Sequence, residues 1–150
     1  MPEVVDQIDT SVLEQLLGYN ARRASLAVIG QFLEDMAEFN LRPVEFSVLT
    51  LIASNPGITA RQLCQQLALL PPNLVGLLNT LVNRDLIRRE PHATDRRATA
   101  LHLAPGADKL VKKAQSRALQ SDEKVLGHLT PAERQTLIDL LKKVYAAPQL

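Results

Sequence analysis

The fold is decided by residues 59–103, TARQLCQQLALLPPNLVGLLNTLVNRDLIRREPHATDRRATALHL. In the middle of this stretch, leucines at positions 74, 77, 78 and 81 have the i, i+3, i+4, i+7 spacing of one helix face. Pro71 and Pro72 suit the first turn of a helix, where backbone N–H groups have no intrahelical partner. The sequence therefore predicts a helix over 71–83 with one buried leucine stripe.

Two further helices are predicted before this one. Thr59 and Gln62 form a capping box, a hydroxyl followed three residues later by Gln, and Leu63 and Leu67 supply the buried side of the helix that it starts. Upstream, Pro43 is well placed at a first helical position, and the turn residues 55–57, NPG, end that helix. Its inward positions are Phe46, Leu49, Ile52 and Ala53.

After residue 83 the hydrophobic period changes from helical to strand-like. Residues 86–90, LIRRE, are compatible with a strand, and residues 98–103, ATALHL, alternate with a period of about two. The polar loop 91–97, PHATDRR, lies between them. We therefore predict a β-hairpin that carries Arg96 and Arg97 side by side in its loop.

Long helical patterns flank this central region. Residues 8–39 have helical spacing throughout, and residues 105–147 contain two more helices, the second begun by a capping box at Thr130 and Glu133. A long terminal helix with apolar residues on more than one side often needs a partner chain to cover it. We expect one domain, 1–150, in which 8–39 and 105–147 dimerise and 41–103 form a winged helix-turn-helix lobe; the fold class is mainly α with a small hairpin wing.

Composition excludes several classes of protein. The 46% hydrophobic and 22% charged content is that of an ordinary globular protein, and the net charge of +1 indicates no partner by itself. One cysteine, Cys64, cannot form an intrachain disulfide, which fits a cytoplasmic protein; we expect it to be a small buried hydrophobe rather than a redox sensor. No signal peptide and no membrane-spanning apolar run is seen, so we expect no membrane partner.

The predicted order of helix, turn, helix and hairpin suits double-stranded DNA. A helix of about 10–12 Å diameter fits a major groove about 12 Å wide. An outward Asn can bond adenine bidentately, and a Val or Thr methyl can touch the thymine methyl. No Arg or Lys precedes Arg84 on this helix, so we expect A·T-rich half-sites. The candidate base-reading residues are Pro72, Asn73, Val75, Gly76, Asn79 and Thr80.

The hairpin region carries a local excess of positive charge. Residues 84–97 hold five arginines against three acids, an electrostatic footprint that the net charge conceals. Arginines in a loop can enter a narrow minor groove, so Arg96 and Arg97 are the candidate wing contacts. Asp95 is expected to orient the guanidinium of Arg97 through a carboxylate pairing.

The stretch from 41 to 103 resembles the multiple antibiotic resistance regulator (MarR) family. The matching residues are 46–49, FSVL; Leu63 with Leu67; 81–87, LVNRDLI; the wing 95–97, DRR; and 103–106, LAPG. The resemblance implies an obligate homodimer, built by interleaving the first and last helices, that represses genes from a pseudo-palindromic operator and is released by small aromatic or phenolic anions. By position, Arg97 would be the family's wing arginine and Asp95 its partner.

Three positions depart from the family pattern. Leu70 stands where a capping Ser or Thr is usual, and Asp85 replaces the usual Gly at the exit of the 71–83 helix, where a left-handed residue is expected. Gly76 stands where a polar or basic contact residue is frequent. These departures concern affinity for DNA and not the fold.

Other candidate sites have weaker signals. Tyr19, Arg22, Arg23, Phe46 and His128 could contribute to a pocket for an aromatic or anionic effector, or could be packing and surface residues. His92, Asp95 and His102 match no standard metal-ligand spacing, so neither a metal nor a cofactor is expected. No nucleophile–base pair or Gly-rich phosphate loop indicates an enzyme. The alternative function is a dimeric winged-helix module for protein interaction without DNA binding.

Overall fold

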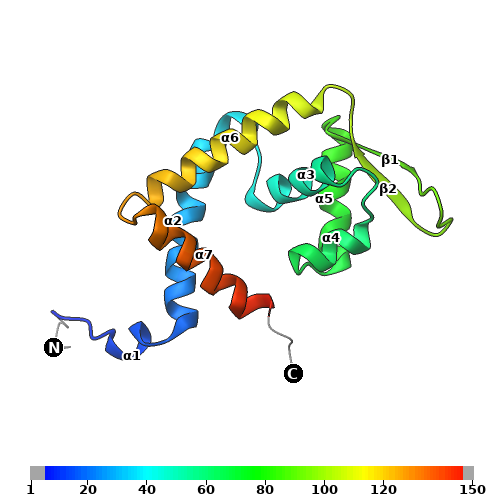
Figure 1. Cartoon of the computed structure of the whole chain (residues 1–150). Coiled ribbons are helices and arrows are strands. Elements are labelled where there is room, and N and C mark those ends of the chain that lie inside the picture. Colours follow the sequence, from blue (N-terminus) through cyan, green and yellow to red (C-terminus); the bar gives the residue numbers. More distant parts are fainter. Residues whose placement is uncertain (1–5, 147–150) are drawn as a thin grey trace, which may run out of the picture.

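The computed structural model describes residues 6–146, and it divides into two parts joined by a long helix (Figure 1). One part holds α3 (Pro43–Ser54), α4 (Ala60–Leu67), α5 (Pro71–Asn83) and a hairpin of β1 (Ile87–Pro91) and β2 (Thr99–Leu103). The other part holds α1 (Ser11–Glu14), α2 (Leu17–Asp35), the 3-10 turn η1 (Ala37–Phe39) and α7 (Pro131–Ala146). Helix α6 (Ala107–Val125) runs from the hairpin into the second part.

The helices of the winged lobe begin and end close to where the sequence predicted. Thr59 caps α4 as expected: its Oγ1 accepts a hydrogen bond from the Gln62 amide at 3.3 Å, and Gln62 Oε1 accepts one from the Thr59 amide at 3.0 Å. The turn to α5 passes through Ala68, which has a left-handed φ of +51°. This turn sets the angle between the two helices of the helix-turn-helix.

The predicted hairpin is antiparallel, with a register from Ile87 opposite Leu103 to Pro91 opposite Thr99. It is also tied to the turn between α3 and α4. The Gly57 amide donates to the Leu101 carbonyl at 2.8 Å, and the Leu101 amide donates to the Ile58 carbonyl at 2.9 Å. The hairpin is therefore held in a defined orientation relative to the helix-turn-helix.

One aliphatic core holds the winged lobe together. Of the predicted leucine stripe of α5, Leu74, Leu78 and Leu81 are buried, while Leu77 is half-buried against the core. The other elements contribute Val48, Leu49, Ile52, Leu63, Leu86, Ile87, Leu101, Ala107, Val111 and Ala114. Burial of each large aliphatic side chain contributes about 1.5–3 kcal/mol, so this core positions α5 and the hairpin as one unit.

The prediction of one long helix over 8–39 is wrong. The chain forms the short α1, then breaks at Leu16, whose backbone is extended (φ −94°, ψ 129°), before α2 begins. The Asn20 side chain donates to the carbonyls of Glu14 and Leu16 at 2.8 Å each and so bridges the break. At the other end, η1 stops at Asn40 in a left-handed conformation. Apolar residues continue across both breaks, so the hydrophobic period does not reveal them.

Helix α2 packs against α6 through paired charges as well as apolar side chains. Lys124 Nζ lies 2.5 Å from Asp35 Oδ1, and Arg117 Nη2 lies 2.5 Å from Glu38 Oε1. The Arg117 guanidinium also lies over the Phe39 ring, 5.9 Å from its centre. These contacts hold residues 35–39 against α6.

Helix α7 begins at the second predicted capping box. Thr130 and Glu133 exchange hydrogen bonds of 2.8 and 3.2 Å, but no residue of α7 is buried. The predicted end of this segment, residue 147, lies outside the described residues. None of the described helices is both long enough and apolar enough to cross a membrane.

Candidate DNA interface

The outward face of α5 is uncharged and exposed. All six residues predicted to read bases are exposed on it: Pro72, Asn73, Val75, Gly76, Asn79 and Thr80. The helix holds neither an acidic nor a basic residue, and Val75 exposes 57% of its surface. This face can therefore approach base edges without opposing the phosphate charge.

The start of α5 has few free backbone donors. Leu70 is the N-cap residue and its side chain makes no cap hydrogen bond, as the sequence departure implied. Pro71 and Pro72 have no N–H, and the Asn73 amide donates to the Leu70 carbonyl at 3.0 Å. Few backbone N–H groups therefore lack a hydrogen-bond partner despite the missing cap. The same shortage of free N–H groups weakens the helix N-terminus as a phosphate site. Charge for phosphate contacts has to come from neighbouring elements.

That charge lies around a groove of about 700 Å³ between α4, α5 and the hairpin. Arg61 at the start of α4, Arg89 on β1 and Arg97 in the hairpin loop line it, with Val75 and Leu78 of α5 on another side. Sequence reasoning did not single out Arg61, although its place in the first turn after the Thr59 cap was a usable signal.

The hairpin loop is folded by hydrogen bonds to side chains. His92 Nδ1 accepts from the amides of Thr94 and Asp95 at 3.3 and 3.0 Å. Asp95 Oδ1 accepts from the Arg97 amide at 2.9 Å, an arrangement typical of Asp in a turn. The carboxylate–guanidinium pairing that we expected is not among the ion pairs within residues 6–146; the carboxylate accepts from the backbone of Arg97 and is not paired with its guanidinium. Asp95 thus shapes the loop and leaves the Arg97 side chain exposed.

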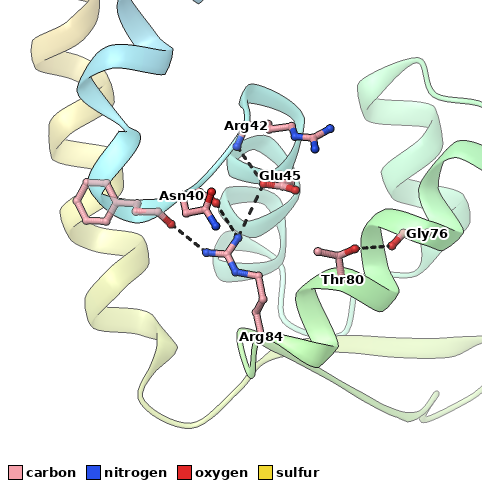
Figure 2. A network of polar contacts seen from close by, with 7 residues as sticks. Asn40, Arg42, Glu45, Gly76, Thr80 and Arg84 are labelled. Atoms are coloured by element: carbon pink, nitrogen blue, oxygen red, sulfur yellow. Dashed lines mark hydrogen bonds and ion pairs between the residues drawn. The ribbon is translucent and has the colours of Figure 1, made fainter.

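Two side chains on the α5 face already have partners in the chain. Arg89 Nη2 donates to Asn79 Oδ1 at 2.7 Å. Thr80 Oγ1 donates to the Gly76 carbonyl at 3.0 Å, one turn back along the helix (Figure 2). A bidentate bond to adenine uses both the oxygen and the nitrogen of an amide, so Asn79 would have to share its oxygen between Arg89 and adenine. Asn73 is left as the better candidate for that contact.

Arg84 does not belong to the positive footprint in which we counted it. Its guanidinium turns inward and donates to the carbonyls of Asn40 and Phe39 at 2.7 and 2.9 Å (Figure 2). Glu45 Oε2 lies 3.9 Å from it and also accepts from the Arg42 amide at 2.9 Å. Arg84 therefore fixes the end of α5 to the segment that joins α2 to α3. The next residue, Asp85, has the left-handed φ that its position predicts, +54°.

Comparison with known proteins shows which family has this architecture. The model of the MarR family matches residues 39–98. A Thauera aromatica protein named as a transcriptional regulatory protein for the hcr operon is 31% identical over 130 residues, which are 86% of this chain and 78% of that protein. The chain belongs to the MarR family. The transcriptional regulator HosA of Escherichia coli O157:H7 is 29% identical over 105 residues, 70% of this chain and 78% of HosA.

Solved structures of the MarR family share the fold over almost the whole chain. The transcriptional repressor CouR, bound to a 23-mer DNA duplex, is 30% identical with a TM-score of 0.86, over 93% of this chain and 99% of CouR. MarR itself from Escherichia coli, in its apo form, is 24% identical with a TM-score of 0.73, over 89% and 98% of the two chains. The curated relatives are named as regulators and not as enzymes, which confirms the class predicted from the sequence.

In this MarR-family chain, three of the five residues predicted to line an effector pocket lie on α2, while Phe46 lies on α3 and His128 lies in the turn between α6 and α7. Arg23 and Tyr19 contact each other on α2, with a 3.4 Å hydrogen bond. Phe46 of α3 packs edge-on against Phe32, with ring centres 5.5 Å apart. Phe32 follows Tyr19 by thirteen residues of α2, which is about 20 Å along a helix. One protomer alone does not bring Tyr19, Arg22 and Arg23 together with Phe46.

The remaining candidates take ordinary structural roles. His102 Nε2 lies 3.3 Å from Glu90 across the hairpin. Within residues 6–146 no group of three His, Cys, Asp or Glu side chains could hold a metal ion. Cys64 packs against the core but is only half-buried, less than the sequence predicted for a small buried hydrophobe.

Proposed function

We propose that this protein is a transcriptional repressor that binds a pseudo-palindromic DNA duplex as a homodimer. The observation that carries the proposal is the uncharged, exposed face of α5 beside a groove lined by Arg61, Arg89 and Arg97. Arginines beside a recognition helix neutralise phosphates and hold the helix in the major groove, while the helix reads base edges. CouR, which shares this fold, has been solved on duplex DNA.

The homodimer is supported by apolar surface that one chain leaves uncovered. No residue of α1, α2 or α7 is buried, although these helices are rich in large aliphatic side chains. Exposed large apolar side chains that gather in this number on a few helices favour an interface between proteins. The exposed residues include Val12, Leu16, Leu17, Leu26, Ile29, Leu33, Leu137, Ile138, Leu140, Leu141, Val144 and Tyr145.

The two-fold symmetry of such a dimer predicts the geometry of the operator. Its two α5 helices would enter successive major grooves on one face of the duplex, about 34 Å and about 10 base pairs apart. The operator would therefore repeat its half-site in inverted orientation with that spacing. The wing loops, with Arg96 and Arg97 exposed, would contact the flanking minor groove or backbone.

We propose that a small aromatic or anionic effector releases the DNA inside the cytoplasm. CouR has also been solved with p-coumaroyl-CoA, an aromatic anion, and it is 29% identical to this chain. Arg22 and Arg23 are exposed on the α2 side and would attract such a ligand. An effector switches the protein only if it binds the DNA-competent and DNA-incompetent conformations unequally.

Selection of duplexes from a random library by the full-length protein tests the proposal. The expected result is enrichment of an inverted repeat with half-site centres about 10 base pairs apart. Addition of p-coumaroyl-CoA or simple aromatic carboxylates to the selected complex then tests release. A folded dimer that enriches no duplex would contradict DNA binding and favour the interaction-module alternative.

A further inference from the structure

The centre of the α5 face carries the methyl groups of Val75 and Thr80, and two of its polar groups already have partners in the chain. Val75 is 57% exposed. The Thr80 hydroxyl donates its hydrogen to the Gly76 carbonyl at 3.0 Å, so it does not donate to a base while that bond holds, and its methyl group remains for apolar contact (Figure 2). Asn79 Oδ1 holds Arg89, which leaves the Asn79 amide nitrogen as a donor.

These groups match one base edge better than the other three. In the major groove thymine presents a methyl group beside the O4 acceptor. Adenine requires an acceptor and a donor together, cytosine requires an acceptor, and guanine offers two acceptors but no methyl group. A surface of methyl groups with one donor is complementary to thymine.

Gly76 leaves room for this contact. A Cβ added at Gly76 would meet no atom of the chain within 4 Å, so the fold does not require glycine here. Glycine inside a helix is less favourable than alanine, and Gly76 has an ordinary helical conformation. Gly76 lies on the exposed side of α5, next to Val75 and one turn before Thr80, where a base edge would approach.

We propose that α5 selects its half-sites through thymine methyl groups, which pack on Val75 and the Thr80 methyl in the space beside Gly76. This inference rests on the proposed DNA-binding function and specifies what its central face reads. The surrounding Arg61, Arg89 and Arg97 supply the charge complementarity that draws a duplex to an otherwise uncharged face. Asn73, at the first turn of α5, is free to read a neighbouring base.

Deoxyuridine substitution in the selected duplex tests the inference directly. Uridine keeps every hydrogen-bonding group of thymine and lacks only the methyl. Burial of one methyl group raises affinity roughly fourfold. Burial of one thymine methyl in each half-site therefore raises the affinity of the dimer roughly 15-fold. We expect at least that loss when the half-site thymines are replaced, and no loss when only flanking thymines are replaced.

Three variants separate methyl contacts from general binding. In Val75→Ala the difference between the thymine and uridine duplexes shrinks. In Arg97→Ala both duplexes are bound more weakly and their ratio stays as in the wild type. Gly76→Ala raises the thermal midpoint of the free protein and weakens binding to the thymine duplex, because the added methyl occupies the space meant for thymine.

The outcomes distinguish this inference from the proposed function. An enriched duplex that is bound equally well with uridine, or enriched half-sites without thymine, overturns the methyl readout and leaves DNA binding intact. A library that yields no enriched duplex overturns the proposed function and this inference with it.

Discussion

Arg84, the residue that ends α5, donates a hydrogen bond of 2.7 Å to the carbonyl of Asn40, 44 positions earlier in the chain. Asn40 follows η1, where the chain leaves the helical part formed by α2 and enters α3. The bond therefore couples the angle of the recognition helix to the position of the helices proposed to dimerise. A movement of α2 that breaks it would also free the end of α5.

Arg84→Ala should lower the free energy of unfolding by about 2 kcal/mol, because two carbonyls lose a charged donor. Urea denaturation measures this change. Arg88→Ala is the matched control: Arg88 pairs with Glu90 at 3.2 Å on the exposed strand, and its loss should change stability by less than about 0.5 kcal/mol. Equal effects of the two substitutions would show that the Arg84 bonds contribute little.

Thr59→Ala should cost about 1 kcal/mol of stability, since it removes the N-cap of α4 that the Gln62 amide uses. Because α4 starts beside Arg61 in the groove, affinity for DNA should fall as well. Gln66→Ala, at an exposed position of the same helix, should leave both quantities close to wild type. Thermal unfolding measures the stability of the two variants, and duplex titration measures their affinity for DNA.

The Asp35 carboxyl makes stability depend on pH in the acid range. Its hydrogen bond with Lys124 holds the pKa of Asp35 below the ordinary value of 3.8. The folded state therefore releases this proton more readily than the unfolded state. The resulting stabilisation is complete above the unfolded pKa and is lost as the pH falls through the folded pKa.

Asp35→Asn should accordingly be less stable than wild type at pH 6, and the gap should close as the pH falls below about 4. Lys124→Gln removes the main cause of the shift and should give the same flattened profile. Chemical denaturation between pH 6 and pH 2.5 measures both. A gap between wild type and Asp35→Asn that stays constant over this range would argue against the assignment.

Val144→Glu should disrupt the proposed homodimer, because it places a charge on the exposed apolar face of α7. Sedimentation should show a shift toward monomer at micromolar concentration, and affinity for a two-half-site duplex should fall with it. Gln135→Glu introduces the same charge at an exposed polar position of α7 and should remain dimeric. A dimeric Val144→Glu would place the interface elsewhere.

The winged lobe could be predicted closely from the sequence, because its signals are local. The leucine spacing of 71–83, the Thr59 cap and the change of period at 86 depend on neighbours within a few residues. The structure confirms each of them. The hairpin loop was also placed correctly, because polar turn residues separate two strand-like runs.

What the sequence did not reveal depends on distant or competing partners. Arg84 bonds to carbonyls more than 40 residues away, and no local pattern separates it from the exposed arginines that follow it. Charge alone suggested that Asp95 pairs with the guanidinium of Arg97, but its carboxylate accepts from the Arg97 backbone amide. The break at Leu16 is hidden by apolar residues on both sides, and the effector residues would need a second chain or a ligand to complete a pocket.

The most direct test of the central claim is a titration of the selected duplex with wild type, Arg97→Ala and Lys142→Gln across a salt series. The account predicts tight binding that weakens steeply with salt, and a slope for Arg97→Ala smaller by about 1 for each wing. Lys142→Gln removes the same charge from α7 and should match wild type. Salt-independent binding, or an Arg97→Ala titration that matches wild type, would contradict the account.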